Sequence, residues 1–184
     1  MTCIVGWMEN DNVWIGGDSA GVAGLFLQIR ADEKVFKKGE FIFGFTSSFR
    51  MGQLIRYKLV IPKAEEGQDV DDYLHTKFVD AVYNCFKDNG YAKIKENEVL
   101  GGVFLFGYRG KLYQVEADFQ IGKSRAIYDA VGCGAEVALG CLYGLNDCSP
   151  GLSPEIKLLK ALNAAQEFSA GVREPFHIIS IKGP

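Results

Sequence analysis

The chain has 184 residues, of which 48% are hydrophobic and 12% aromatic, and this is enough apolar side chain for the core of one domain spanning 1–184. Its 20 basic and 23 acidic residues are mixed along the sequence and give a formal charge of -3, so no basic stripe is present that would neutralise nucleic-acid phosphates. The longest apolar runs are far shorter than the roughly 20 residues of a membrane-spanning helix. We therefore expect neither nucleic acid nor a membrane as a partner.

The cysteines and histidines give little support for a disulfide framework or a metal site. The five cysteines are widely spaced and include no C-x-x-C pair, which favours reduced thiols in a cytoplasmic protein. The two histidines, His75 and His177, stand at no ligand spacing from a cysteine or from each other. No signal peptide is expected, because the polar residues 10–12 interrupt the N-terminal apolar run.

The first 45 residues are predicted to be nearly all sheet. Apolar and β-branched runs at 3–9 and 13–17 flank Asn10-Asp11-Asn12, whose side chains tolerate the positive φ of a tight turn. Three shorter strands are expected over 25–29, 34–37 and 41–45.

Two helices are predicted next. The first covers 47–59 with Ser47 or Ser48 as its N-cap. The second covers 70–88 behind Asp69, with an apolar residue at every fourth position. That periodicity predicts one buried helix face.

The second half of the chain repeats the order of strands followed by helices. Strands over 99–108 and 111–117 are predicted to form a hairpin around Arg109-Gly110, and the first of them is apolar enough for burial on both faces. A strand at 125–131, helices at 135–145 and from Ser153-Pro154 onward, and a last strand at 176–181 complete the chain. Segregated runs of this kind indicate an α+β fold of antiparallel sheets covered by helices.

Candidate chemistry lies in the first 34 residues. Thr2 follows the initiator Met1, Asp18 stands sixteen positions later (18 − 2), and Lys34 another sixteen on (34 − 18). If Met1 is removed, the α-amine of Thr2, with an ordinary pKa of about 7.7 to 8.0, can act as the base for its own hydroxyl. A nearby Lys34 would favour the deprotonated forms and Asp18 would hold that lysine. A backbone N–H around Ser47 could stabilise an oxyanion, because the first N–H groups of a helix lack internal partners.

These segments resemble the proteasome β-subunit and HslV-like family of N-terminal nucleophile (Ntn) hydrolases. The matching segments are Thr2 with Ile4-Val5, the run at 13–19, Lys34-Val35, the run at 44–47 and Val131-Gly132-Cys133-Gly134. The resemblance implies a four-layer αββα sandwich and catalytic roles for Thr2, Asp18 and Lys34. It also implies that the segment holding Ser19, Ala20 and Val22 lies beside the substrate as an added strand.

The resemblance implies supporting residues as well, with some departures from the family pattern. Ser47, as oxyanion donor and substrate contact, stands where the family commonly has Gly, and Cys133 stands where it usually has Ser. Ser169 fits the family's late Ser, and the late Asp finds only Gln166 or Glu167. By analogy with HslV, carbonyls around Gln166, Ser169 and Val172 are expected to hold a monovalent or divalent structural cation, with no other cofactor required.

The sequence thus predicts a threonine peptidase that cuts peptide bonds through an acyl-enzyme on Thr2. A homo-oligomeric ring, protein or peptide substrates and an ATPase unfoldase are the partners that the resemblance implies. Two alternatives stay open at this point. One is an Ntn amidohydrolase acting on a small amide, and the other is a catalytically inactive assembly subunit that keeps Met1.

Overall fold

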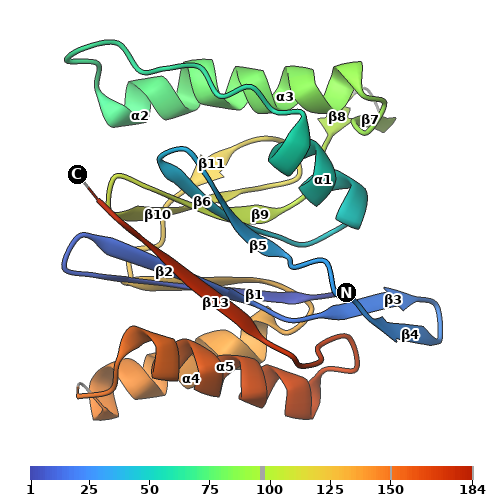
Figure 1. The fold of residues 1–184 in the computed structure, drawn as a ribbon, viewed down its shortest axis with the longest axis vertical. Coiled ribbons are helices and arrows are strands. Elements are labelled where there is room, and N and C mark those ends of the chain that lie inside the picture. The colour runs from blue at the N-terminus through green and yellow to red at the C-terminus, as the bar shows by residue number, and fades with distance from the viewer. Residues whose placement is uncertain (96–97, 150, 184) are drawn as a thin grey trace.

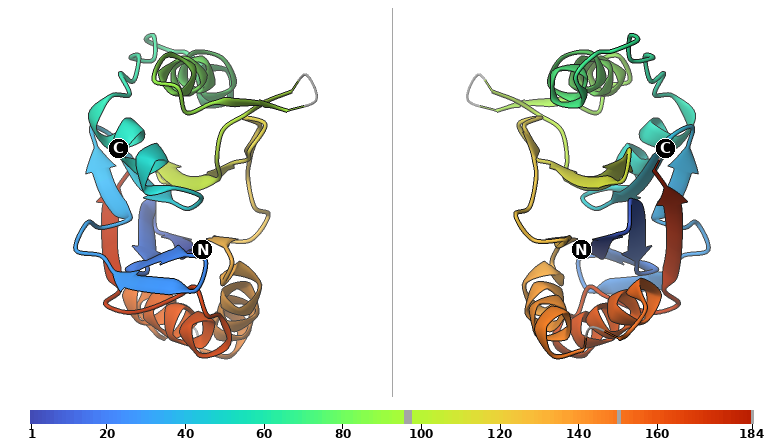
Figure 2. Two further views of the ribbon diagram at one scale, coloured as in Figure 1. Left: turned by 90° about the vertical axis from the view of Figure 1, so that its right-hand side faces the viewer. Right: turned by 90° about the vertical axis from the view of Figure 1, so that its left-hand side faces the viewer.

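The computed structural model describes residues 1–95, 98–149 and 151–183, and Figure 1 shows its helices and sheets stacked in four layers. One sheet has the strand order β12-β1-β2-β13 and the other the order β11-β10-β9-β6-β5, with antiparallel pairing throughout. Helices α1, α2 and α3 cover the second sheet, and α4 and α5 cover the first (Figures 1 and 2). The predicted α+β class and αββα sandwich are confirmed.

The strands of the first sheet are β1 (Cys3–Glu9), β2 (Asn12–Gly17), β12 (Tyr128–Gly132) and β13 (His177–Lys182). Those of the second are β5 (Val35–Lys38), β6 (Phe41–Phe45), β9 (Phe104–Tyr108), β10 (Lys111–Val115) and β11 (Ile121–Gly122). The helices are α1 (Phe49–Tyr57), α2 (Val70–Tyr73), α3 (Val79–Asp88), α4 (Ala135–Cys148) and α5 (Pro154–Phe168), and a π-helical turn (Leu74–Phe78) joins α2 to α3. No helix in the described ranges has both the length and the apolar character to cross a membrane.

Local signals in the sequence explain most of these boundaries. Asn10 and Asp11 have φ values of 50° and 58°, as the predicted β1–β2 turn requires. Asp69 accepts a hydrogen bond from the N–H of Asp72, and Ser153 caps α5 with Pro154 at its first position. The predicted caps of these two helices are therefore confirmed.

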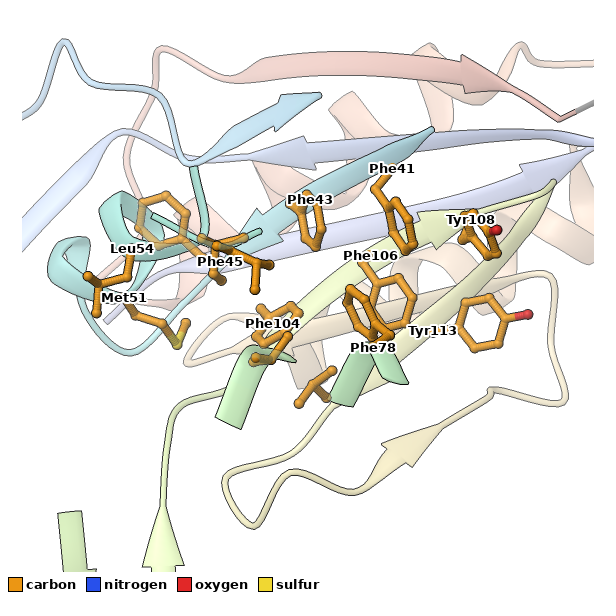
Figure 3. Close-up of a cluster of buried hydrophobic side chains, with 14 of the residues drawn as sticks. Phe41, Phe43, Phe45, Met51, Leu54, Phe78, Phe104, Phe106, Tyr108 and Tyr113 are labelled. Atoms are coloured by element: carbon orange, nitrogen blue, oxygen red, sulfur yellow. The ribbon is translucent and has the colours of Figure 1, made fainter. Parts of the chain in front are cut away.

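Three buried clusters separate the four layers. The cluster between α1–α3 and the second sheet is aromatic, and Figure 3 shows Phe41, Phe78 and Tyr108 stacked within it. The ring centroids of Phe41 and Tyr108 lie 4.3 Å apart, and those of Phe41 and Phe78 lie 5.1 Å apart. Aliphatic residues fill the cluster between the sheets. The cluster beneath α4 and α5 combines small and aliphatic residues with Trp7 and Tyr128, whose rings stack.

Several predicted boundaries were wrong. The single strand expected over 99–108 is two strands, because the N–H of Gly101 bonds to the carbonyl of Ala117 and the chain leaves the sheet there. Its first part, β8 (Glu98–Leu100), pairs with β7 (Lys93–Lys95), which the sequence analysis missed. The strand expected at 125–131 begins only at Tyr128 and extends to Gly132.

The helix expected over 47–59 begins at Phe49 instead. Ser48 is the N-cap and accepts a hydrogen bond from the N–H of Arg50, while Ser47 has a φ of 54° that a helix cannot contain. The strand expected at 25–29 is β4 (Phe26–Ile29), which joins neither main sheet. It pairs with β3 (Ala20–Ala23) in a hairpin that projects beside the N-terminus in Figure 1.

Candidate active site

The candidate site lies where the ends of five strands meet. In the antiparallel pairs of the first sheet, the start of β1 lies beside the end of β2 and the end of β12. Because the β5–β6 pair is also antiparallel, the start of β5 lies beside the end of β6. Thr2, Asp18, Lys34, Ser47 and Cys133 each stand one or two residues beyond one of these strand ends. Strand pairing therefore gathers residues that are up to 131 positions apart.

Lys34 is the centre of the polar contacts around Thr2. Its Nζ donates to Thr2 Oγ1 at 2.7 Å, to Asp18 Oδ1 at 2.8 Å and to the carbonyl of Ala20 at 2.7 Å. An ammonium group has three protons, so these three acceptors use all of them. The side chains of Lys34 and Asp18 are 1% and 0% exposed, which makes this a buried ion pair.

Burial also changes the acid–base properties of this cluster. It lowers the pKa of Lys34, and the Asp18 carboxylate opposes that shift. It raises the pKa of the Cys3 thiol, and Asp18 adds to that rise. Cys3 is 0% exposed, so it is a neutral packing residue.

Asp18 is held mainly by backbone donors. Its Oδ1 accepts from the N–H of Cys3 at 3.0 Å, and its Oδ2 accepts from the N–H groups of Ala20 at 2.9 Å and Arg173 at 3.3 Å. Both carboxylate oxygens thus have N–H partners in addition to Lys34. The carboxylate is fixed from three segments of the chain and in turn fixes the ammonium group.

The backbone of Thr2 is held by the turn that follows β12. Gly132 has a φ of 102°, and a Cβ at this position would lie 2.2 Å from the carbonyl oxygen of Thr2, so only glycine fits. The N–H of Thr2 donates to Cys133 Sγ at 3.2 Å, and Ser169 Oγ donates to the same sulfur at 3.4 Å. Cys133 therefore contacts the nitrogen of Thr2, and Ser169 in turn contacts Cys133.

Met1 precedes Thr2, and its carbonyl contacts the hydroxyl group of Thr2. Thr2 Oγ1 donates to the Met1 carbonyl at 2.5 Å, and Met1 itself is 53% exposed. While Met1 is attached, the nitrogen of Thr2 is an amide whose lone pair is delocalised, so it cannot accept a proton. General-base chemistry at this nitrogen requires the Met1–Thr2 peptide bond to be cut.

A small cavity of about 60 Å³ opens beside Thr2. It is lined by Met1, Thr2, Ala20, Val22, Lys34, Phe45, Thr46, Ser47, Ser48 and Phe49. Ser47 Oγ accepts from the N–H of Val103 at 3.1 Å, which holds this residue in its left-handed conformation. Within the described ranges the N–H of Ser47 donates no hydrogen bond.

The predicted substrate and cation residues lie in two different places. Ala20 and Val22 line the cavity, whereas Ser19 is turned away and donates through its Oγ to the carbonyl of Pro175 at 2.6 Å. The carbonyls of Gln166, Ser169 and Val172, which were predicted to hold a cation, all accept hydrogen bonds from Arg173 Nη1. Among the described residues, no group of three or more His, Cys, Asp or Glu side chains is placed to hold a metal ion.

Arg173 and Phe49 are the site residues that sequence reasoning missed. Phe49 is the first residue of α1 and its ring lies 5.6 Å from Lys34 Nζ. Its position directly after Ser47-Ser48 could have indicated it. Nothing in the sequence around Arg173 indicates that its guanidinium folds back onto carbonyls up to seven residues earlier.

Solved structures that resemble this chain agree on its fold. No family model and no curated protein matches the chain by sequence. Among solved structures, Thiobacillus denitrificans BPH has a TM-score of 0.84 at 16% identity, covering 100% of this chain and 99% of that one. The same protein in complex with epoxomicin has a TM-score of 0.82, with 16% identity over 100% of both chains.

Two further structures extend this result. Eukaryotic HslV from Trypanosoma brucei has a TM-score of 0.72 at 15% identity, with 98% of this chain and 99% of that chain covered. An Anbu (Gly-1) mutant from Hyphomicrobium sp. strain MC1 has a TM-score of 0.70 at 12% identity, with 99% and 82% covered. Such identities establish the architecture alone. The protein therefore has the fold of the HslV- and proteasome-like proteins.

Proposed function

We propose that this protein is a peptidase whose nucleophile is the N-terminal threonine that remains after Met1 is removed. The observation that carries the proposal is the 2.7 Å contact between Lys34 Nζ and Thr2 Oγ1, made by a lysine that is itself paired with buried Asp18. A buried cation on a hydroxyl favours its deprotonation and thus its attack on a carbonyl. The fold shared with HslV supports the same class of reaction.

In the proposed reaction, Thr2 Oγ attacks the carbonyl carbon of a peptide bond and transfers its proton to the free α-amine. The N–H of Ser47, which borders the cavity, stabilises the oxyanion. The C–N bond then breaks, the α-amine passes the proton to the departing amine, and an ester remains on Thr2. Water attacks this ester, releases the acid product and returns a proton to Oγ.

The substrate is proposed to be an extended peptide. Strand β3 contributes Ala20 and Val22 to the cavity wall, and an added strand beside β3 would place a carbonyl near Thr2. A cavity of about 60 Å³ accepts a few side-chain atoms, which suits one residue of a peptide whose remainder lies outside. Hydrolysis of small amides only, with no turnover of peptides, would instead favour the amidohydrolase alternative.

We also propose that the protein works as a homo-oligomeric ring, fed by an ATPase unfoldase and placed in the cytoplasm. The β3–β4 hairpin supports self-association, because Leu25 is 106% exposed, Phe26 68% and Ile29 48%. Apolar side chains gathered on one projecting hairpin are unfavourable in water and indicate a covered surface. Light scattering on the purified protein, compared with a Leu25→Ser/Phe26→Ser variant, would measure the oligomer.

Intact mass together with peptide turnover tests the central proposal. We expect the purified protein to lack Met1, to cleave fluorogenic peptides and to gain the mass of epoxomicin, the compound bound by the Thiobacillus denitrificans protein. Thr2→Ala should lower turnover by at least about 10³-fold with an unchanged fold, and Thr2→Ser should retain part of it. Retained Met1 without an epoxomicin adduct would support an inactive assembly subunit, and wild-type turnover in Thr2→Ala would exclude Thr2.

A further inference from the structure

We propose that Arg173 is a built-in cation that takes the place of a metal or alkali ion at the carbonyl site behind Thr2. Arg173 Nη1 donates to the carbonyls of Val172 at 2.5 Å, Ser169 at 3.1 Å and Gln166 at 3.5 Å. These are the three carbonyls that the resemblance implies as the ligands of a bound cation. One nitrogen of a permanently charged guanidinium therefore already lies at their meeting point.

The end of α5 explains why a positive charge is needed here. The last carbonyls of a helix have no internal partners and form the negative end of its dipole. Helix α5 runs over 15 residues to Phe168 and has no basic residue in its last turn. Gln166 belongs to that turn, so Arg173 supplies from outside the helix the cation that the helix itself lacks.

The same observation argues against a metal ion at this position. A metal ion bound by the three carbonyls would share their oxygens with the guanidinium and would lie beside a like charge. A second contact holds the segment after Arg173 against the end of α5, because the N–H of Glu174 donates to Gln166 Oε1 at 2.7 Å. We conclude that the residues present do not fit a bound metal at this point.

Arg173 connects the segment 166–173, whose carbonyls its guanidinium contacts, to the candidate active site. Its N–H donates to Asp18 Oδ2 at 3.3 Å, and its carbonyl accepts from the N–H of Ser19 at 2.8 Å. The loop that its guanidinium closes contains Ser169, whose Oγ contacts Cys133 beside the nitrogen of Thr2. Arg173 is thus a positioning residue that acts on Thr2 from two directions, through Asp18 and through Ser169.

The test compares cation dependence in the wild type and in Arg173→Ala. Thermal unfolding is measured in a buffer whose only cation is a tetraalkylammonium ion, and then with added K⁺, Na⁺, Mg²⁺ or Ca²⁺ at matched ionic strength. We expect the wild-type Tm to stay within about 1 °C, because the site is already filled. Arg173→Ala should lose on the order of 5 °C, which is the scale for a charged hydrogen-bond group in a chain of this size, and one of the cations should restore at least about half of that loss.

Two further variants separate charge from general damage. Arg173→Lys keeps a positive charge on a flexible stem, so we expect a smaller loss of Tm that no added cation restores. Arg125→Ala removes an exposed arginine in the segment before β12 and should change neither Tm nor cation response. If Arg173→Ala does not fold, the wild type and Arg173→Lys still decide the question.

Two results would overturn the inference. One is a saturable stabilisation of the wild type by a cation, and the other is an Arg173→Ala variant with unchanged Tm or with a loss that no cation restores. These measurements require no peptidase activity, so they can fail or succeed independently of the proposed function. If the protein is a peptidase as proposed, the cation concentration that restores the Tm of Arg173→Ala should also restore its turnover of peptides. That recovery would be further support for the inference.

Discussion

Replacement of Lys34 by Met is the sharpest test of the charge arrangement around Thr2. The change keeps an unbranched side chain in the buried position, with sulfur in place of one methylene group, and removes the ammonium group. That group donates to Thr2, Asp18 and the Ala20 carbonyl, so the variant leaves a buried carboxylate without its cation. Removing one partner of a buried ion pair costs about 3 to 5 kcal/mol.

The structure places the expected cost near the lower end of that range. Asp18 keeps three backbone N–H donors after the change, from Cys3, Ala20 and Arg173, so its charge remains partly compensated. We therefore expect Lys34→Met to lower the free energy of unfolding by about 3 kcal/mol. Turnover of peptides should fall by at least about 10²-fold, because the hydroxyl loses the cation that favours its deprotonation.

Urea unfolding of the wild type, Lys34→Met and Lys37→Met provides the measurement. Lys37 is the exposed lysine of strand β5, which begins directly after Lys34, and its replacement should change stability by no more than about 0.5 kcal/mol. Equal stability of Lys34→Met and Lys37→Met would refute the argument, since a buried pair cannot lose its cation without cost. Unchanged turnover in Lys34→Met would refute the role of Lys34 separately.

Two further predictions concern the backbone at Ser47 and the carboxyl of Asp129. Ser47 has a φ of 54°, a left-handed conformation that glycine adopts without the steric cost of a Cβ. Urea unfolding should therefore show Ser47→Gly to be more stable than Ser47→Ala by about 1 to 2 kcal/mol. Equal stabilities of the two variants would contradict backbone strain at this residue. Burial raises the pKa of the Asp129 carboxyl above its ordinary value of 3.8, so the folded protein binds the carboxyl proton more tightly than the unfolded chain does. The folded protein therefore loses stability as the pH rises from 3.8 through the raised pKa. Asp129→Asn should therefore be more stable than the wild type at pH 7 and show a weaker fall between pH 4 and 7. Exposed Asp80→Asn is the control, and an equal pH response in both variants would count against the assignment.

Much of the fold could be predicted because local signals agree with the tertiary structure. The Asn10-Asp11 turn has the positive φ that its residue types predicted, and Arg109-Gly110 joins β9 to β10 in the predicted hairpin. Once the hairpins are placed, antiparallel pairing brings Thr2, Asp18 and Lys34 to the same end of the two sheets, so their convergence follows from strand order. Their catalytic roles remain predictions until turnover is measured.

The parts that could not be predicted depend on contacts between distant segments. The apolar run at 99–108 reads as one strand, and only the bond from Gly101 to the carbonyl of Ala117 shows that it divides. The β3–β4 hairpin has apolar residues that would normally be placed in a core, yet Leu25 and Phe26 are exposed. Periodicity reports which residues are apolar, and it cannot distinguish a core from a surface that another chain covers.

The contacts of Asp18 suggest why a buried charge pair is retained at a cost in stability. The pair gains Coulomb energy only by losing hydration, and apolar residues of the same size could pack there with equal stability. An apolar residue would, however, leave the N–H groups of Cys3, Ala20 and Arg173 without their acceptor. A carboxylate satisfies all three and orients Lys34 toward Thr2 Oγ1. One residue thus holds the segments that surround Thr2. A change in any of these segments should displace Thr2 Oγ1 before it unfolds the protein.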